Sequence, residues 1–250
     1  MELEHHEQLL SLGWDADKQE GINQIVLRHQ NKIEFIHGDN IAFLRWCKEN
    51  QLWKYFHVGI VDPPYGISVG DMRLGATIAS EAKNPRKYEM GSWDGAVPTA
   101  EYWELLRYCC RELIVWGGNY FTKEFDWSGR GFYVWNKKNN GMSFADCELA
   151  LTTMDFSARI IPKSRSLSES EGDKRHPTHK PAYLYEYLHL QHDLRGKKVL
   201  DTHGGSFSHA QAAFRESVKL TIMDRERSYF DSGLEAFDAK VNSSPTGFLF

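Results

Sequence analysis

The sequence predicts an α/β fold with a largely parallel sheet. Apolar runs rich in β-branched and aromatic residues recur along the 250 residues, and amphipathic segments with a period near 3.6 lie between several of them. Strands that alternate with helices are typical of α/β domains, because each helix returns the chain to the start of the next parallel strand. A chain of this length can bury a sizeable core, so we expect a single domain over residues 1–250.

Seven apolar runs are expected to form strands. Each combines Val, Ile, Leu or aromatic residues with few charges, as strands of a buried sheet do. An eighth run, residues 156–161, is expected to pair with the run before it. The seven are KIEFI (32–36), HVGIV (57–61), ELIVW (112–116), GFYVW (131–135), CELALTT (147–153), KKVLD (197–201) and KLTIM (219–223).

Four segments are expected to form helices, because their apolar residues recur on one helical face. Asn40 and Thr99 suit N-cap positions, and Pro181 suits a first helical turn. The four segments are residues 40–52, 99–110, 181–194 and 226–240.

The composition excludes several classes of protein. Hydrophobic residues make up 41% and charged residues 26%, as in ordinary globular domains. No apolar run approaches the length that crosses a bilayer, and the start MELEHHEQLL lacks the basic and apolar regions of a secretory signal. We therefore expect a cytoplasmic protein with no membrane partner. The net charge of −4 argues against coating nucleic acid through bulk charge, although a local basic face remains compatible with it.

The four cysteines, Cys47, Cys109, Cys110 and Cys147, lack the paired spacing of a metal site. Two of them are direct neighbours. Reduced thiols in a cytoplasmic protein are the simplest interpretation, and no metal is expected.

Acidic residues follow several of the predicted strands. In open α/β sheets, ligands bind beyond the carboxyl ends of the strands. Asp39, Asp62, Gly117, Asp201 and Asp224 occupy such positions. Each aspartate alone is also a common turn residue, but four at one edge exceed what turns need. This edge is therefore the candidate ligand site.

The stretch VDPPYG (61–66) holds a carboxylate and an aromatic ring on stiff backbone, because two adjacent prolines fit neither a sheet nor a helix interior. The Asp62 carboxylate and the Pro63 carbonyl offer two acceptors for the two N–H groups of an exocyclic amine, which would aim its lone pair at an electrophile. Pro64 stiffens the loop, and Tyr65 offers a face on which a base can stack. A base inside a duplex would have to be flipped out.

Two long segments, residues 66–98 and 162–180, are expected to be loops beside this edge. Connections of this length are usually functional or mobile, and we expect these to contact an anionic partner. Little other sequence is available for reading bases, so specificity is expected to be short or loose, or to be helped by a second subunit. The basic residues of these loops include Lys83, Arg86, Lys87, Lys163, Arg165, Lys174 and Arg175.

Three motifs follow one another in a specific order: VDPPYG (61–66), RHPTHKP (175–181) and VLDTHGGSFSHA (199–210). In this order the chain resembles the amino-group DNA methyltransferases that use S-adenosylmethionine (SAM), in the circularly permuted β class of phages and bacteria. IVWGGNYF (114–121) and the stretch 134–150 are similar too. The resemblance implies a Rossmann-like class I methyltransferase domain, with a seven-stranded, mixed but mostly parallel sheet in circularly permuted order.

The resemblance also implies a role for each motif residue. Asp62, Pro63, Pro64 and Tyr65 would be catalytic. The turn from Asp201 to Ser206 would surround the methionine part of SAM. Asp224 would bind the ribose hydroxyls, Asp39 would reach the adenine, and Thr178 and Lys180 would close over the methionine end. The residues expected to bind SAM are Asp39, Thr178, Lys180, Asp201, His203, Gly204, Gly205, Ser206 and Asp224.

Two positions depart from the family pattern. The cofactor loop usually reads D-P-F-x-G-S-G-T, but Phe207 stands here in place of the last glycine, with Gly204 as a candidate compensation. Asp224 stands where the family usually has Glu. These departures support an alternative, a catalytically silent subunit that binds nucleic acid or a partner methyltransferase.

The expected activity is site-specific transfer of a methyl group from SAM to the N6 amino group of adenine in DNA, as in restriction–modification. Cytosine-N4 methylation uses the same chemistry and remains open, as do single-stranded DNA or RNA as substrate and a homodimer or partner subunit. Methylation of a protein glutamine amide is less favoured, because that family prefers Asn where this chain has Asp62.

Overall fold

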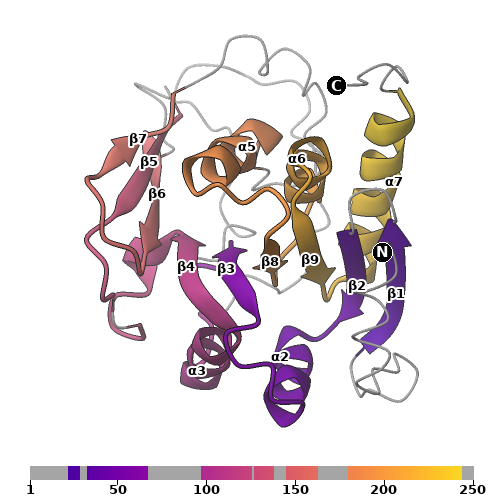
Figure 1. The fold of residues 1–250 in the computed structure, drawn as a ribbon, viewed down its shortest axis with the longest axis horizontal. Helices are drawn as coiled ribbons and strands as arrows, with labels where there is room; N and C mark the ends of the chain where they lie inside the picture. The colour runs from indigo at the N-terminus through magenta and orange to yellow at the C-terminus, as the bar shows by residue number, and fades with distance from the viewer. Residues whose placement is uncertain are drawn as a thin grey trace, which may run out of the picture.

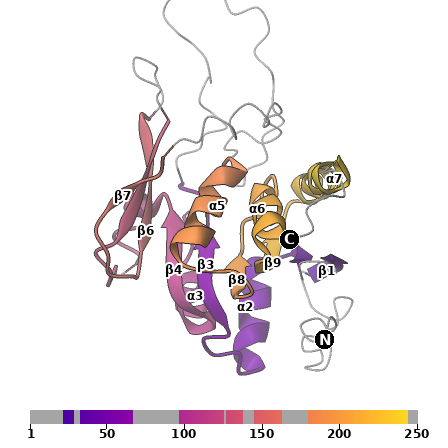
Figure 2. The same ribbon diagram turned by 45° about the horizontal axis from the view of Figure 1, so that its top comes forward.

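A computed structural model describes residues 22–28, 33–66, 97–125, 127–137, 145–162 and 180–243. These residues form one sheet with helices on both faces: α5, α6 and α7 cover one face, and α2 and α3 cover the other (Figures 1 and 2). The predicted α/β architecture is therefore confirmed. No helix in the described part of the chain is long and apolar enough to cross a membrane.

The sheet has nine strands in the order β1-β2-β9-β8-β3-β4-β6-β5-β7. Its centre, from β2 to β4, is parallel throughout, and β1, β6 and β5 are joined to it by antiparallel pairing. The strands are β1 (Ile22–Arg28), β2 (Ile33–Gly38), β3 (Phe56–Val61), β4 (Cys110–Trp116), β5 (Phe132–Asn136), β6 (Cys147–Thr152), β7 (Arg159–Ile160), β8 (Lys198–Asp201) and β9 (Lys219–Asp224).

The expectation of seven strands was wrong by two edge strands. β1 pairs with β2 and was not predicted. The eighth run was expected to pair with the run before it, β6, but β7 pairs with β5 instead. Both sides of β6 are already occupied, by β4 and by β5, so the only free backbone that β7 can reach is the outer edge of β5.

The predicted helices are α2 (Asn40–Glu49), α3 (Ala100–Cys109), α5 (Ala182–Gln191) and α7 (Arg227–Ser243), and all four are confirmed. Thr99 caps α3 as expected, and Pro181 takes the cap position of α5. Asp39, rather than Asn40, caps α2, because its Oδ1 accepts a hydrogen bond of 3.0 Å from the Ala42 N–H.

One helix, α6 (Ser208–Glu216), was not predicted. It follows Phe207 without any side-chain cap, so the usual start signal is missing. Its buried face is built mainly from alanines. α6 nevertheless positions the turn 201–206 by packing between α5 and α7 over the sheet (Figure 1).

Two apolar cores hold the sheet between its helical layers. The core under α5–α7 includes the buried rings of Phe35, Phe207, Phe230 and Phe237, and the core under α2 and α3 includes large aromatic residues of both helices. Because β2, β9, β8 and β3 are parallel, their carboxyl ends meet at one edge. This places Asp39, Asp62, Asp201 and Asp224 close together.

Candidate active site

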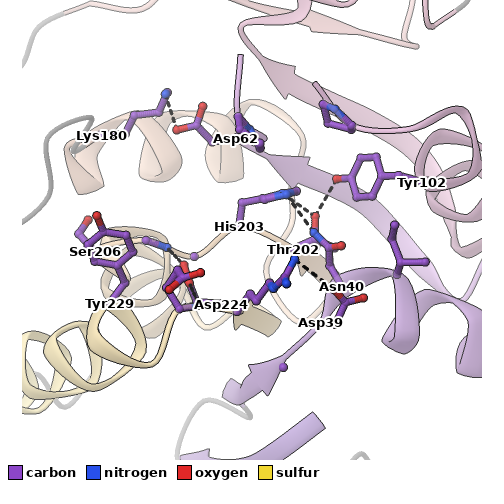
Figure 3. A pocket seen from close by; sticks show the side chains of 18 of the residues that line it. Asp39, Asn40, Asp62, Tyr102, Lys180, Thr202, His203, Ser206, Asp224 and Tyr229 are labelled. Carbon is purple, nitrogen blue, oxygen red and sulfur yellow. Dashed lines mark hydrogen bonds and ion pairs between the residues drawn. The ribbon is translucent and has the colours of Figure 1, made fainter. Parts of the chain in front are cut away.

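A cavity of about 480 Å³ opens at the carboxyl ends of β2, β3, β8 and β9 (Figure 3). Pro63, Tyr65 and Asp201 are not among the residues that line it. Thr178 lies outside the described residues, as do nearly all of the predicted loops 66–98 and 162–180. The sequence-predicted site residues that do line the cavity are Asp39, Asp62, Pro64, Lys180, His203, Gly204, Gly205, Ser206 and Asp224.

The glycine-rich turn after β8 is tied to β9 by hydrogen bonds. The Gly205 N–H donates to Asp224 Oδ2 at 2.8 Å, and the Gly204 N–H donates to the Met223 carbonyl at 2.7 Å. Gly205 has a φ of +53°, which glycine adopts without a steric cost. The turn therefore forms one wall of the cavity with its backbone close to the open space.

Phe207 adopts the left-handed conformation that the last glycine of the family pattern would supply, with a φ of +54°. Its ring is fully buried and packs against Phe35 and Phe230, with ring centroids 5.2 and 5.6 Å away. A Cβ atom on Gly204 would lie 2.3 Å from the Phe207 ring, so glycine is required there. The ring thus fills the core beneath the turn and leaves the cavity open.

The two acids beside the turn have different positions. Asp224 lines the cavity, and its Oδ1 accepts a hydrogen bond of 2.9 Å from the Glu226 N–H. Asp201 lies beneath the turn, where its carboxylate accepts from the His203 N–H at 3.0 Å and contacts His209 Nδ1 at 2.8 Å. Burial raises the pKa of each aspartate to about 7. Asp201 therefore supports the turn, and Asp224 is the acid that a ligand can reach.

A chain of polar side chains crosses the cavity from α2 to α3 (Figure 3). Asn40 Nδ2 lies 3.0 Å from His203 Nε2, His203 Nδ1 lies 3.0 Å from the Thr202 hydroxyl, and that hydroxyl lies 2.7 Å from the Tyr102 hydroxyl. Burial lowers the pKa of His203 to about 3, so its ring is neutral. Tyr102 was not selected from the sequence as a site residue, because its apolar position on α3 is equally typical of a core residue.

The DPPY loop places Asp62 at the opposite wall of the cavity. Asp62 Oδ1 accepts a hydrogen bond of 2.7 Å from the Tyr65 hydroxyl, and Oδ2 accepts one of 2.5 Å from Lys180 Nζ. Burial raises the pKa of Asp62, although the nearby Lys180 ammonium acts against this. The HPTHKP motif is thus connected to the DPPY loop through its lysine.

Tyr65 lies behind Asp62 and is held by aromatic contacts. Its ring stacks on Tyr120 with centroids 4.9 Å apart and an interplanar angle of 14°, and it meets Phe121 edge-on. Gly117, with a φ of +65°, lies directly against the ring, and a Cβ atom there would lie 2.2 Å from Tyr65 Cε1. Tyr120 was not selected from the sequence as a site residue, although it lies in the IVWGGNYF stretch.

This close approach makes Gly117→Ala a specific test of how Tyr65 is positioned. Gly196 has a similar φ of +70°, but a Cβ atom there meets nothing within 4 Å, so Gly196→Ala is a matched control. Both changes carry the backbone cost of a positive φ, and only Gly117→Ala adds the clash. We expect Gly117→Ala to lower the free energy of unfolding by about 1–3 kcal/mol more than Gly196→Ala in urea titrations. Equal losses would contradict the close contact.

No protein-family model matches the chain. Among solved structures, the M1.HpyAVI–SAM complex aligns over 82% of this chain and 99% of its own, with a TM-score of 0.53 and 16% identity. PvuII DNA methyltransferase (cytosine-N4-specific) aligns over 82% of this chain and 86% of its own, with a TM-score of 0.50 and 14% identity. The described residues have the same Rossmann-like fold as these two structures. At these identities the likeness establishes the fold alone.

The Rossmann-like DNA-methyltransferase fold agrees with the predicted fold class, apart from the strand count. The DPPY strand precedes the glycine-turn strand in the chain, and the two are direct parallel neighbours, β3 and β8. The DPPY loop and the glycine turn therefore face each other across the cavity, although about 140 residues separate them in the sequence.

Proposed function

We propose that this chain transfers a methyl group from SAM to the N6 amino group of adenine at specific sites in DNA. The observation that carries the proposal is the position of Asp62. Its carboxylate, held by Lys180 and Tyr65, lines the same cavity as the glycine turn and Asp224. Asp62, the proposed acceptor for the target amine, thus faces a cavity of about 480 Å³, a size suited to a nucleoside-containing cofactor.

The cavity residues fit SAM chemically. Asp224 would accept hydrogen bonds from the ribose hydroxyls, Asp39 would reach the adenine, and the backbone of Gly204, Gly205 and Ser206 would surround the methionine part. Lys180 and Thr178 would close over the methionine end, and of these two residues the structure describes Lys180. SAM would supply a methyl group already activated on a cationic sulfur, and M1.HpyAVI was solved in complex with SAM.

The DPPY residues would orient the substrate amine. Asp62 and the Pro63 carbonyl would each accept one N–H of the amino group, which turns its lone pair toward the cofactor. Pro64 would keep the loop rigid, and Tyr65 would stack on a base that is flipped out of the DNA duplex. Transfer would be direct, without a covalent enzyme intermediate: the amine nitrogen would form the new bond to the methyl carbon as the bond from that carbon to sulfur breaks, S-adenosylhomocysteine would leave, and the methylated nitrogen would lose one proton to solvent.

The proposed partner is DNA, bound by a single methyltransferase domain in the cytoplasm, alone or with a second subunit. Cytosine-N4 methylation is the second candidate, because PvuII DNA methyltransferase, which has the same fold, is cytosine-N4-specific. The adenine and cytosine amino groups each have two N–H donors, one for Asp62 and one for the Pro63 carbonyl. A catalytically silent subunit is less favoured, because Phe207 fills the core and leaves the cavity open.

Mass spectrometry of nucleosides tests the proposal. The full chain would be incubated with unmethylated genomic DNA with and without SAM, and in parallel with single-stranded DNA and RNA. We expect N6-methyl-2′-deoxyadenosine only where SAM and DNA are both present. N4-methyl-2′-deoxycytidine alone would replace the adenine assignment with the second candidate. Failure to detect either base with SAM bound to the protein would refute a DNA methyltransferase.

Asp224 gives the proposed cofactor site a pH dependence. Burial raises the pKa of Asp224 to about 7, and ribose hydroxyls donate best to the ionised carboxylate. Binding should therefore release a proton below pH 7, and SAM affinity should rise by about tenfold from pH 6 to pH 8. Asp224→Asn should weaken binding and remove this rise in calorimetric titrations. A tenfold rise that persists in the variant would show that a different group, such as Asp201, is responsible.

A further inference from the structure

Lys180 lies between two carboxylates, only one of which belongs to the DPPY loop. Its Nζ is 2.5 Å from Asp62 Oδ2 and 3.1 Å from Glu148 Oε2, and the Tyr65 hydroxyl is also 3.1 Å away. The lysine side chain is 3% exposed, and the rings of Tyr65 and Trp116 flank the ammonium group. The buried ammonium therefore donates hydrogen bonds to Asp62 and to the Tyr65 hydroxyl, and Glu148 Oε2, which accepts no hydrogen bond from the described residues, contacts it as an ion-pair partner.

Glu148 contacts Lys180 from β6, and β4 lies between β6 and β3 in the sheet. It also forms an ion pair with Lys137, which directly follows β5. Burial acts to raise the pKa of Glu148, but the ion pairs with Lys180 and Lys137 outweigh it, so its pKa is lowered and the group is ionised. Lys137, Glu148, Lys180 and Asp62 form a row of alternating charges with a net charge of zero.

The row conflicts with the proposed task of Asp62. Tyr65 and Lys180 each donate to one of its two carboxylate oxygens, so an incoming amine must either share an oxygen with one of these donors or displace it. Lys180 cannot withdraw alone, because a buried ammonium without a carboxylate partner is strongly unfavourable. Glu148 already contacts Lys180 and can keep it neutralised without moving it far.

We propose that Glu148 is a positioning residue that retains Lys180 when the target amine takes its place on Asp62. This inference rests on the proposed methyl transfer. The neutral amine then replaces Lys180 at Asp62, and the net charge of the row Lys137, Glu148, Lys180 and Asp62 stays zero. Positive charge that develops on the target nitrogen during transfer faces Asp62, and Glu148 compensates the charge of Lys180.

The inference has a signature in the pH dependence of the rate. In the described part of the chain, the ionisable groups that interact with Lys180 are Asp62 and Tyr65 after β3, Glu148 on β6 and Asp201 on β8, and Tyr185 on α5 lines the same cavity. Burial acts to lower the pKa of Lys180, but Asp62 and Glu148 together raise it. The charge of Glu148 also adds to the effect of burial in raising the pKa of Asp62. Removing the charge of Glu148 should lower the pKa of Asp62 and the pKa of Lys180. Both the acid limb and the alkaline limb of the pH–rate profile should therefore move to lower pH.

The test uses Glu148→Gln in the full chain, with saturating SAM and a DNA substrate. The amide keeps the shape of Glu148 but removes its charge, so Asp62 becomes the carboxylate that neutralises Lys180. Lys180 should then compete with the target amine for Asp62. We expect kcat to fall about tenfold or more, the KM for SAM to stay within about twofold, and the pH profile to shift as described. Glu148→Asp keeps the charge and should recover part of kcat.

Glu186→Gln is the matched control, because Glu186 is also a shielded carboxylate in an ion pair, with Arg215 at 2.6 Å, outside the cavity. Its kcat should equal that of the wild type. An active wild type whose Glu148→Gln variant keeps its kcat and pH profile would overturn this inference alone. If Glu148→Gln does not fold, Glu148→Asp carries the test: its carboxylate is one methylene shorter in reach to Lys180, so kcat should fall below the wild-type value, and a wild-type kcat would overturn the inference. A wild type that methylates no nucleoside would overturn the proposed function and this inference with it.

Discussion

Asp62→Ala is expected to abolish methyl transfer, with a fall in kcat of about 10³-fold, while SAM affinity stays within about threefold. The reason is that Asp62 would supply one of the two acceptors that orient the amine, whereas the proposed ribose and adenine contacts belong to Asp224, at the end of β9, and to Asp39, which follows β2. The measurement combines single-turnover methylation rates with calorimetric titration of SAM.

The variant should still fold, because Lys180 retains its ion pair with Glu148 when Asp62 is removed. Asp62→Asn is the conservative companion: its amide oxygen keeps one acceptor but lacks the charge, so we expect an intermediate rate. Asp155→Ala, which removes an exposed ion pair with Arg130 far from the cavity, controls for the loss of a carboxylate. Turnover retained in Asp62→Ala would eliminate the proposed role of the DPPY loop.

Phe207→Ala is expected to lower the free energy of unfolding by about 3–5 kcal/mol, as for other fully buried phenylalanines. Alanine keeps the backbone cost of the positive φ and loses only the ring, which packs against Phe35 and Phe230. Urea unfolding monitored by circular dichroism gives the value, and the m-value shows whether unfolding stays two-state.

Phe207→Gly separates the ring from the backbone at this position. Glycine leaves about the same empty space in the core as alanine, but it adopts a φ of +54° readily. Phe207→Gly should therefore be about 1 kcal/mol more stable than Phe207→Ala. It also restores the glycine of the family pattern, and SAM affinity should change little, because the ring lies outside the cavity. Equal stability of Phe207→Gly and the wild type would show that the ring adds nothing to the core.

The sequence was sufficient to predict the central sheet and four helices, because apolar periodicity records which faces are buried. It did not predict β1, since an edge strand forms through backbone pairing and needs no apolar face, and it predicted the eighth run, which contains β7, with the wrong partner. The partner of β7 depended on which side of β6 was already occupied, which is a property of the whole sheet. α6 was missed because Phe207 begins it without a capping side chain.

The site was predicted only where a local motif carries its chemistry. Asp62, Asp224 and the glycine turn could be located because strand ends and motif order mark them. Glu148 and Tyr120 lie in the stretches 134–150 and 114–121, which resemble the family, but nothing in these stretches indicates that either side chain contacts the DPPY loop or Lys180. Asp201 was expected to bind SAM, but the structure places it beneath the turn, where it holds His203 and His209.

A crystal structure of the chain grown with SAM tests the central claim most directly. The account predicts that the ribose hydroxyls contact Asp224, that the adenine lies beside Asp39, and that the sulfur-bound methyl group faces the Asp62 carboxylate. SAM bound elsewhere, or bound in the cavity with its methyl group directed away from Asp62, would contradict the account.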